Sequence, residues 1–437
     1  MSVLLFLLLF VPLSLVLAWW VAERNDRALL IRRTAVAWLV LAPLTAVMND
    51  WMPFAGGGDD ESYYELAQPP PSSVAEALDF SRFQGFMEQP GYPALLSLMN
   101  ALVGHDLLCY KLLNVFFFIT LSIVWYRIGL VLNGRAFARA ASLAVLLLTP
   151  LWYSVFFILK DMVITLLQSV FLLGVVQAWS RVRFVPLFLI ALTSLCVILF
   201  RSALVVQQAG VLVGTVAARG LAQSRLRGRL VTVVVPILIC VVMLIALSNR
   251  ELLATLGIRS ESRVLSESML DSAATRRGGT AVSTMLFPLL YLFTETAGLN
   301  PRAWARLDPF WLRGVLALPW IVVAVPGFLL GIHHLCSAPA VPSTARAKHQ
   351  SWIRRLRLSK ALATPWSAVL IFVVSYFAIS WSVGDTTRWR VPDMPMFAAI
   401  AVVGWMNTGH ARRTRVLIWW TILLGALFGA FYLLRGM

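Results

Sequence analysis

The stretch VLLFLLLFVPLSLVLAWWVA, residues 3–22, decides the fold class of this chain. It carries no charged side chain and has the length of about 20 apolar residues that an α-helix needs to cross a bilayer. Similar runs recur along the 437 residues, of which 59% are hydrophobic and 13% charged, whereas soluble proteins carry about 25% charged residues. The short alternating segments of membrane β-barrels do not occur. We therefore expect an all-α integral membrane protein. This first run lacks a basic flank and a small-residue cleavage site, so we expect it to be retained rather than cleaved as a signal peptide.

The hydropathy pattern predicts a single transmembrane domain over residues 1–437 with about twelve helices. The expected spans are 3–22, 34–51, 107–130, 137–157, 162–180, 184–200, 203–218, 230–248, 311–334, 364–383, 393–408 and 415–433.

Basic segments between the expected spans predict the topology. The segments ERNDRALLIRR, SRVR, ARGLAQSRLRGR, TARAKHQSWIRRLRLSK and HARRTR alternate correctly for the cytoplasmic side. The outer side then holds residues 49–106, the turn at 159–161, residues 249–310 and the segment GDTTRWR. Within 249–310, the apolar run 285–299 contains Pro288 and Glu295, so we expect it to be interfacial or re-entrant rather than a span.

The outer side is unexpectedly basic for a chain of net charge +17. Its basic residues include Lys160, Arg201, Arg250, Arg259, Arg263, Arg276, Arg277, Arg302, Arg306, Arg388 and Arg390. Guanidinium groups match phosphate oxygens, so a phosphate on a lipid carrier is the partner we expect, with outer acids or lipid headgroups as the alternative. Basic residues scattered through short loops do not indicate nucleic acid. The four cysteines show no ligand spacing, so we expect neither disulfides nor structural zinc.

The segment FAGGGDDESYYELAQ, residues 54–68, brings three adjacent carboxylates to the outer face. The glycines permit a sharp turn, and Asp59 or Asp60 suits a helix N-terminus, which is one interpretation of the pair. In the following helix Asp60 and Tyr64 share a face. A second acid, Asp161, follows Lys160 in FFILKDMVITLL, at a turn close to the hydrocarbon boundary where ionisable residues are functional candidates; the alternative is that these two residues only pair with each other.

Carboxylates beside a basic face suit glycosyl transfer from a lipid phosphate. An attacking hydroxyl needs one carboxylate base, and a phosphate leaving group needs cations rather than a general acid. Hydrolysis of a glycosidic bond needs a paired acid and base instead. One base with several arginines therefore favours transfer.

Four segments in this order resemble the GT-C membrane glycosyltransferases, in the bacterial branch related to protein O-mannosyltransferases and lipid A aminoarabinose transferases. DDESYYELA resembles the first-loop signature D-E-x-x-Y-x-x-x-A. QPGYPALLSLMNALVGHDLLCYKLLNV resembles the block P-G-Y-P…R-L-L-N, with Lys111 where Arg is usual. WYSVFFILKDMVITLLQSVFLLG resembles the block with the second acid. TTRWRVPDMPMFAAIA resembles R-Y-R-x-P-x-x-P, with Trp389 for Tyr.

The resemblance implies a bundle of transmembrane helices with juxtamembrane helices on the extracytoplasmic face. It also implies an inverting enzyme that uses a polyprenyl-phosphate sugar and transfers the sugar to a glycan, lipid or protein. The expected location is a bacterial inner membrane, with the site facing the periplasm or exterior and surrounded by membrane lipids.

The resemblance also assigns roles to single residues. It implies Asp60 as general base, with Asp59 as the other choice, and Asp161 as the second acid. It implies that the donor phosphate is bound by Lys160, Arg388 and Arg390. We add Arg201 to these residues because of its place at the outer face. We expect substrate binding by Glu61, Tyr64 and Tyr92.

Other possibilities stay open on the sequence alone. A divalent cation, Mg²⁺ or Mn²⁺, would take oxygens from Asp60 and Asp161, whereas Lys160 would neutralise Asp161 without a metal. An O-antigen polymerase or ligase would also act on polyprenyl-linked glycans outside the membrane, through arginines and a histidine in large loops. A transporter or flippase of a lipid-linked anion would place charges deep inside spans, whereas the charges here gather at one face.

Overall fold

The computed structural model describes residues 2–54, 59–68, 71, 73–83, 90–180, 182–201, 203–222, 309–337, 364–383 and 391–435. All regular structure within these ranges is helical. Six of the described helices are long and apolar enough to cross a membrane: Ser2–Val21, Arg24–Trp51, Leu107–Leu146, Asp161–Trp179, Phe184–Arg201 and Val315–Leu335. The chain is thus a helical membrane protein. The expected span 230–248, the segment 285–299, nearly all of the loop 249–310 and the segment 384–390 lie outside the described residues.

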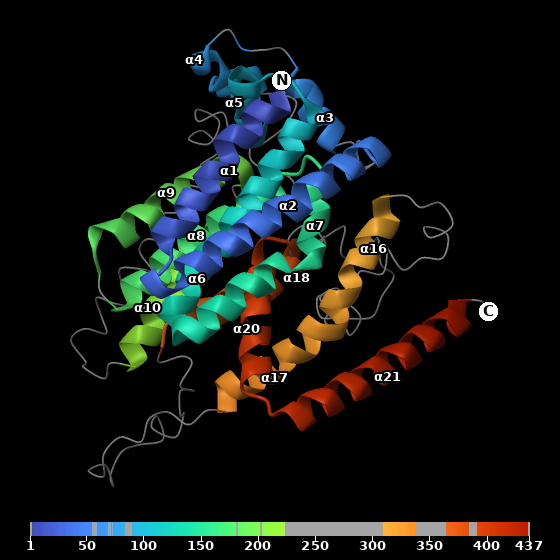
Figure 1. Ribbon diagram of the computed structural model, residues 1–437. Helices are drawn as coiled ribbons and strands as arrows, with labels where there is room; N and C mark the ends of the chain where they lie inside the picture. Colours follow the sequence, from blue (N-terminus) through green and yellow to red (C-terminus); the bar gives the residue numbers. More distant parts are fainter. Residues whose placement is uncertain are drawn as a thin grey trace.

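Two N-terminal helices form the first layer of the bundle. Helix α1 (Ser2–Val21) and helix α2 (Arg27–Trp51) are joined by the short 3-10 helix η1 (Arg24–Asp26). The Trp38 indole N–H donates to the Ser14 hydroxyl at 2.8 Å, so each helix satisfies a polar group of the other inside the apolar layer. Both helices pack on α6 (Leu107–Leu146) (Figure 1).

Helix α6 is a hairpin of two helices. The backbone leaves the helical conformation at Asn133 and at Gly134, whose φ of 80° is one that glycine adopts readily. The Ser122 and Ser142 hydroxyls lie 2.9 Å apart, whereas twenty residues of straight helix span about 30 Å. The two halves therefore run antiparallel, as separate spans starting near 107 and 137 predict.

The expected single span 137–157 is wrong in one respect. Helix α6 ends at Leu146, and a separate short helix, α7 (Thr149–Phe156), follows. Pro150 lies in the first turn of α7, where its missing N–H costs no hydrogen bond. A proline at this position could not continue the preceding helix, which explains the break.

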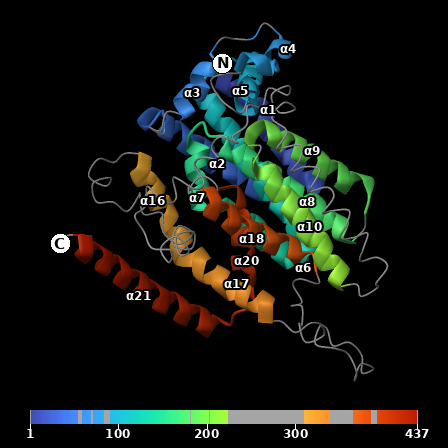
Figure 2. The ribbon, with the colours of Figure 1, turned by 180° about the vertical axis from the view of Figure 1, so that it is seen from behind.

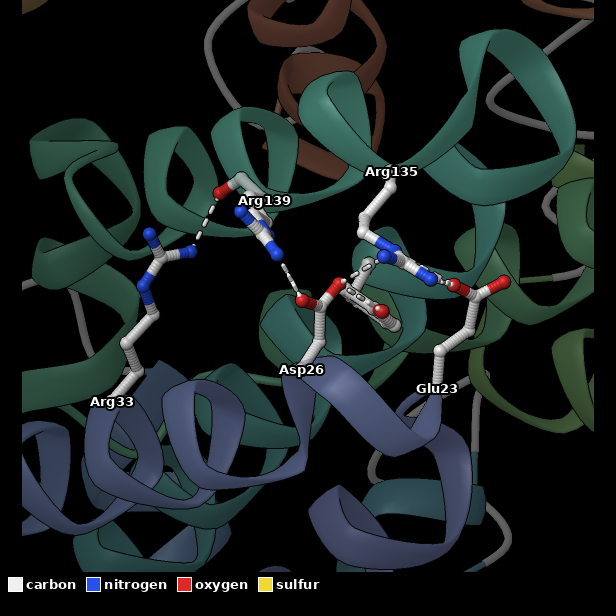
Figure 3. A network of polar contacts seen from close by, with 6 residues as sticks. Glu23, Asp26, Arg33, Arg135 and Arg139 are labelled. Carbon is white, nitrogen blue, oxygen red and sulfur yellow. Dashed lines mark hydrogen bonds and ion pairs between the residues drawn. The ribbon is translucent and has the colours of Figure 1, made fainter.

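A polar cluster holds the α1–α2 connection against the hairpin of α6 (Figure 3). Asp26 is fully buried and accepts hydrogen bonds from Tyr126, at 2.7 Å, and from the Arg139 guanidinium. Arg135 donates two hydrogen bonds to Glu23, at 2.9 and 2.8 Å. The basic segment that the charge pattern assigns to the cytoplasm and the turn of α6 thus lie at the same end of the bundle.

The next layer consists of α8 (Asp161–Ser180), α9 (Phe184–Arg201), α10 (Ala203–Ala222) and α18 (Trp366–Val383). A buried row of amides links α8 and α10 to the 3-10 helix η6 (Val391–Asp393). Gln208 donates to Gln168 at 2.8 Å, Gln168 to Gln207 at 3.0 Å, and Gln207 to the Asp393 carboxylate at 2.7 Å. Each amide in this row has its partner on a neighbouring helix, so the row fixes how these helices are rotated relative to one another.

The C-terminal helices complete the bundle. Helix α16 (Pro309–Pro319) continues through a π-helical turn, η4 (Trp320–Ala324), into α17 (Val325–Ser337), which packs on α20 (Met394–Met406). A Cβ added to Gly404 would overlap the backbone oxygen of Gly327, and one added to Gly331 would overlap that of Ile400. Small residues thus permit backbone contact between these helices. The last helix, α21 (His410–Arg435), runs alongside α16 and α17 (Figures 1 and 2).

Candidate functional site

The acidic segment lies at the opposite end of the bundle from the α6 turn, with a group of short helices (Figure 1). These are α3 (Asp59–Leu66), α4 (Val74–Ala77), the 3-10 helix η2 (Phe80–Phe83) and α5 (Gly91–Val103). The Asn100 side chain on α5 donates to the Ala67 carbonyl at 2.7 Å, which ties α5 to the end of α3. The rings of Tyr63 and Tyr92 pack edge to face at 5.0 Å. The expected outer loop therefore contains helices that fold back on the bundle.

Asp60 is a buried member of the three adjacent carboxylates in the segment 54–68. Only 1% of its surface is exposed, whereas Glu61 is exposed. One Asp60 oxygen accepts the Glu61 backbone N–H at 3.1 Å, as expected near a helix N-terminus. Asp59 begins α3, and its side chain lies outside the description. A buried carboxylate needs a nearby cation, and the structure supplies one.

That cation is Lys111, in the first turns of α6. It is fully buried, its ammonium donates to the Met52 carbonyl at 3.3 Å, and it lies 5.6 Å from the centre of the Phe157 ring. The carboxylates of Asp60 and Asp50 attract it. The sequence shows Lys111 only as a departure from a motif; its place inside an apolar run was the signal that could have marked it as a site residue.

Asp161 and Arg201 form the second charged pair. Asp161 begins α8 and Arg201 ends α9. Both are 5% exposed, and the guanidinium lies 3.4 Å from the carboxylate. Lys160 is half-buried in the turn before α8. The structure thus gives Asp161 a buried cationic partner forty residues away in the sequence.

Asn114 holds the turn that carries Lys160 and Asp161. It is fully buried, and its amide lies 3.1, 2.8 and 3.2 Å from the carbonyl oxygens of Ser154, Phe157 and Leu159. These are the carbonyls that the break between α7 and α8 removes from helical hydrogen bonding. The sequence pattern alone does not reveal this role of Asn114.

Tyr92, at the start of α5, contacts both α3 and α6. Its hydroxyl donates to the Asn114 side-chain oxygen at 3.3 Å. Burial raises the pKa of the Tyr92 hydroxyl, and the carboxylates of Asp161 and Asp60 raise it further, which places both acids within electrostatic range. A Cβ on Gly91 would lie 2.8 Å from the Leu199 carbonyl, so the start of α5 lies directly against the end of α9. The first turns of α3, α5, α6 and α8 and the last turn of α9 therefore meet.

Tyr64 lies in an aromatic cluster beside this site. Its ring centre is 4.4 Å from that of His105 and 6.1 Å from that of Tyr110. His105 Nδ1 lies 2.9 Å from the Tyr110 hydroxyl. Burial lowers the pKa of His105, and the Asp106 carboxylate opposes this shift. His105 is thus bonded locally, to Tyr110.

The remaining predicted residues are not brought into the site by the described structure. Arg388 and Arg390 lie outside the described residues. Within the described ranges, no three side chains of His, Cys, Asp or Glu gather in a manner that could hold a metal ion.

The fold and site define a helical membrane protein with a buried ion pair, Asp161 with Arg201, and with buried Asp60 and Lys111 at the same end of its bundle. Comparisons with protein-family models, curated proteins and solved structures found no match for this chain.

Proposed function

We propose that this protein is an inverting glycosyltransferase that moves a sugar from a polyprenyl phosphate to a hydroxyl group on the extracytoplasmic side of a bacterial inner membrane. The observation that carries the proposal is that two buried carboxylates, Asp60 and Asp161, lie at the same end of the bundle: α3 packs on α5 through Tyr63 and Tyr92, and α5 begins against the end of α9, where Arg201 pairs with Asp161. Asp60 is the general base for the acceptor hydroxyl, which is a glycan, lipid or protein.

The buried cations support the role of base. A base must be ionised before it accepts a proton, and a carboxylate removed from water stays ionised only beside positive charge. Lys111 supplies that charge for Asp60. The ammonium is fixed by the Met52 carbonyl and not by surface solvent, so its position relative to Asp60 is determined by the fold.

The second pair suits the donor phosphate. The Arg201 guanidinium lies 3.4 Å from an oxygen of Asp161, and its N–H groups have the fork geometry that matches phosphate oxygens. Lys160 lies in the adjacent turn. In this proposal both cations face the leaving phosphate, together with Arg388 and Arg390, and Asp161 orients Arg201. Tyr64, Tyr92 and Glu61 border the acceptor. No step of the proposal uses a metal; Mg²⁺ or Mn²⁺ at Asp60 and Asp161 stays a prediction.

The test compares Asp60→Asn with Glu65→Gln, an exposed carboxylate on the same helix. Purified protein is incubated with synthetic polyprenyl phosphates carrying labelled hexoses or pentoses, and with whole membranes as the source of acceptor. We expect Asp60→Asn to lower kcat at least about 100-fold, the usual contribution of a general base, and Glu65→Gln to leave it unchanged.

Three outcomes overturn the proposal. Near-normal turnover of Asp60→Asn, with thermal stability equal to wild type, removes Asp60 as the base. Consumption of pyrophosphate-linked oligosaccharide alone by the wild type replaces the proposal with an O-antigen polymerase or ligase. Transport of the lipid-linked sugar across vesicle membranes, without transfer to an acceptor, replaces the proposal of a glycosyltransferase with that of a flippase.

A further inference from the structure

A groove of about 680 Å³ lies between α17 and α21, on a part of the bundle that the candidate site does not use. This volume falls within the range of about 300–1,000 Å³ found for ligand pockets. In Figures 1 and 2, the end of α17 and the start of α21 lie at the end of the bundle opposite α3 and α5. The groove therefore needs an explanation separate from glycosyl transfer.

The lining of the groove is polarised. His333 is in the last turns of α17, and Arg412 and Arg415 are in the first turns of α21, so the basic residues share one end. The rest of the lining is apolar, and Leu329, Trp419 and Leu423 are 46%, 70% and 48% exposed. The groove thus joins a cationic end to an apolar trough.

The length of the trough matches one leaflet of a bilayer. Arg412 and Leu423 are eleven residues apart on one helix, or about 16 Å at 1.5 Å per residue. The hydrocarbon core is about 30 Å thick, so the trough extends to near its midplane. The charge pattern assigns the segment HARRTR to the cytoplasmic side, where anionic lipids attract basic residues.

The chain supplies no acid of its own in these segments. Neither residues 309–384 nor residues 394–437 contain an aspartate or a glutamate. A second copy that docked through the same two helices would bring further arginines and no carboxylates. Charge complementarity therefore favours an anion that carries acyl chains.

We propose that this groove binds one anionic phospholipid of the cytoplasmic leaflet. Its phosphate is held by Arg412 and Arg415, because guanidinium groups bond phosphate oxygens in a fork geometry. One acyl chain lies in the trough over Leu329, Trp419 and Leu423. The proposal does not depend on the glycosyltransferase function.

The test measures lipid retention by native mass spectrometry. Purified protein in detergent is titrated with phosphatidylglycerol and, in parallel, with phosphatidylcholine. The variant Arg412→Ala/Arg415→Ala is compared with Arg32→Ala/Arg413→Ala, which removes the same charge. Arg32 is exposed on α2, and the Arg413 side chain bonds the Thr408 carbonyl and does not line the groove.

We expect wild type to retain phosphatidylglycerol in preference to phosphatidylcholine. A basic residue near an anionic lipid contributes about a factor of five, so the groove variant binds phosphatidylglycerol about 25-fold more weakly, and the control variant binds within about twofold of wild type. A variant with lysine at both groove positions keeps most of the affinity, which shows that the change acts through charge.

Three results overturn the proposal. Equal losses in the groove and control variants assign the binding to general surface charge. Unchanged retention in the groove variant removes the site. A dimer that dissociates in the groove variant while lipid retention stays constant assigns the surface to a second copy.

Discussion

Replacement of Asn114 tests whether the turn before α8 depends on a single side chain. Its amide lies within 3.2 Å of three buried carbonyl oxygens, at Ser154, Phe157 and Leu159. The NH₂ group has two hydrogens, so two full hydrogen bonds are made. The Phe157 carbonyl also accepts the Leu159 N–H, so it keeps a partner when the amide is removed.

The magnitude follows from the two carbonyls that lose their donor. A buried acceptor left unsatisfied costs about 1–3 kcal/mol, so Asn114→Ala should lower the free energy of unfolding by about 4 kcal/mol. Asn100→Ala removes one such bond, to the Ala67 carbonyl, and should cost about 2 kcal/mol. Asn114→Asp places a carboxylate against the same oxygens, so it should destabilise more than alanine.

The assay is equilibrium unfolding by SDS in mixed micelles, followed by tryptophan fluorescence, with hydrogen exchange measured over residues 157–161. We expect the order of stability to be wild type, Asn100→Ala, Asn114→Ala and Asn114→Asp, with faster exchange of the turn in both Asn114 variants. Equal losses in the two alanine variants, or an aspartate variant as stable as wild type, would refute the reasoning.

Three further predictions concern other parts of the bundle. Arg201→Met leaves Asp161 as a buried charge without this partner and should lower the free energy of unfolding by about 3 kcal/mol. Arg201→Lys keeps the positive charge and should lower it less. SDS titration measures the stability of both variants. Because the folded pKa of His105 is lowered, the unfolded chain binds the proton first, so the melting temperature should fall as pH drops through about 6.5, and less so in His105→Phe. Gly404→Ala should cost about 1–3 kcal/mol by overpacking the contact of α17 with α20, whereas Gly409→Ala, with open space around it, should be neutral.

Each of these predictions has an outcome that contradicts it. Equal stability of the methionine and lysine variants at Arg201 would show that the pair with Asp161 contributes no charge stabilisation. Parallel pH profiles of wild type and His105→Phe would assign the acid sensitivity to other groups. An alanine at Gly404 that is tolerated as well as one at Gly409 would mean that α17 and α20 separate at little cost.

The helices were largely predictable because membrane spans are encoded locally. A run of apolar residues as long as a bilayer is thick predicts a helix from its own composition, and the expected span 184–200 is α9, Phe184–Arg201. The expected span 34–51 is part of α2, which begins at Arg27. Hydropathy misses these first turns because they are polar, although they are equally helical. Six of the described helices meet the length and hydropathy criteria of a span; the expected twelve spans and the GT-C arrangement stay predictions.

The site was predictable only in part because its contacts join distant segments. Local sequence marks Asp60 and Asp161 as unusual acids near span ends. It does not show that Asp161 pairs with Arg201 across two helices, or that Lys111 and Asp60 are both buried at the same end of the bundle. These partners depend on helix rotation, which tertiary packing decides and a uniformly apolar span does not reveal. Polar residues inside apolar runs, such as Lys111 and Asn114, were the available signal.

The row of amides that ends at Asp393 has a consequence for biosynthesis. Gln168 and Gln207 leave the ribosome early, but the carboxylate that completes their row lies 186 residues after Gln207. At roughly 5–20 residues per second, α8 and α10 wait about 10–40 seconds in the membrane for the segment that precedes α20. Throughout that interval the Gln207 amide lacks its carboxylate acceptor. A chain that ended before Val391 would therefore remain in the membrane with its first layer assembled and its second layer incomplete.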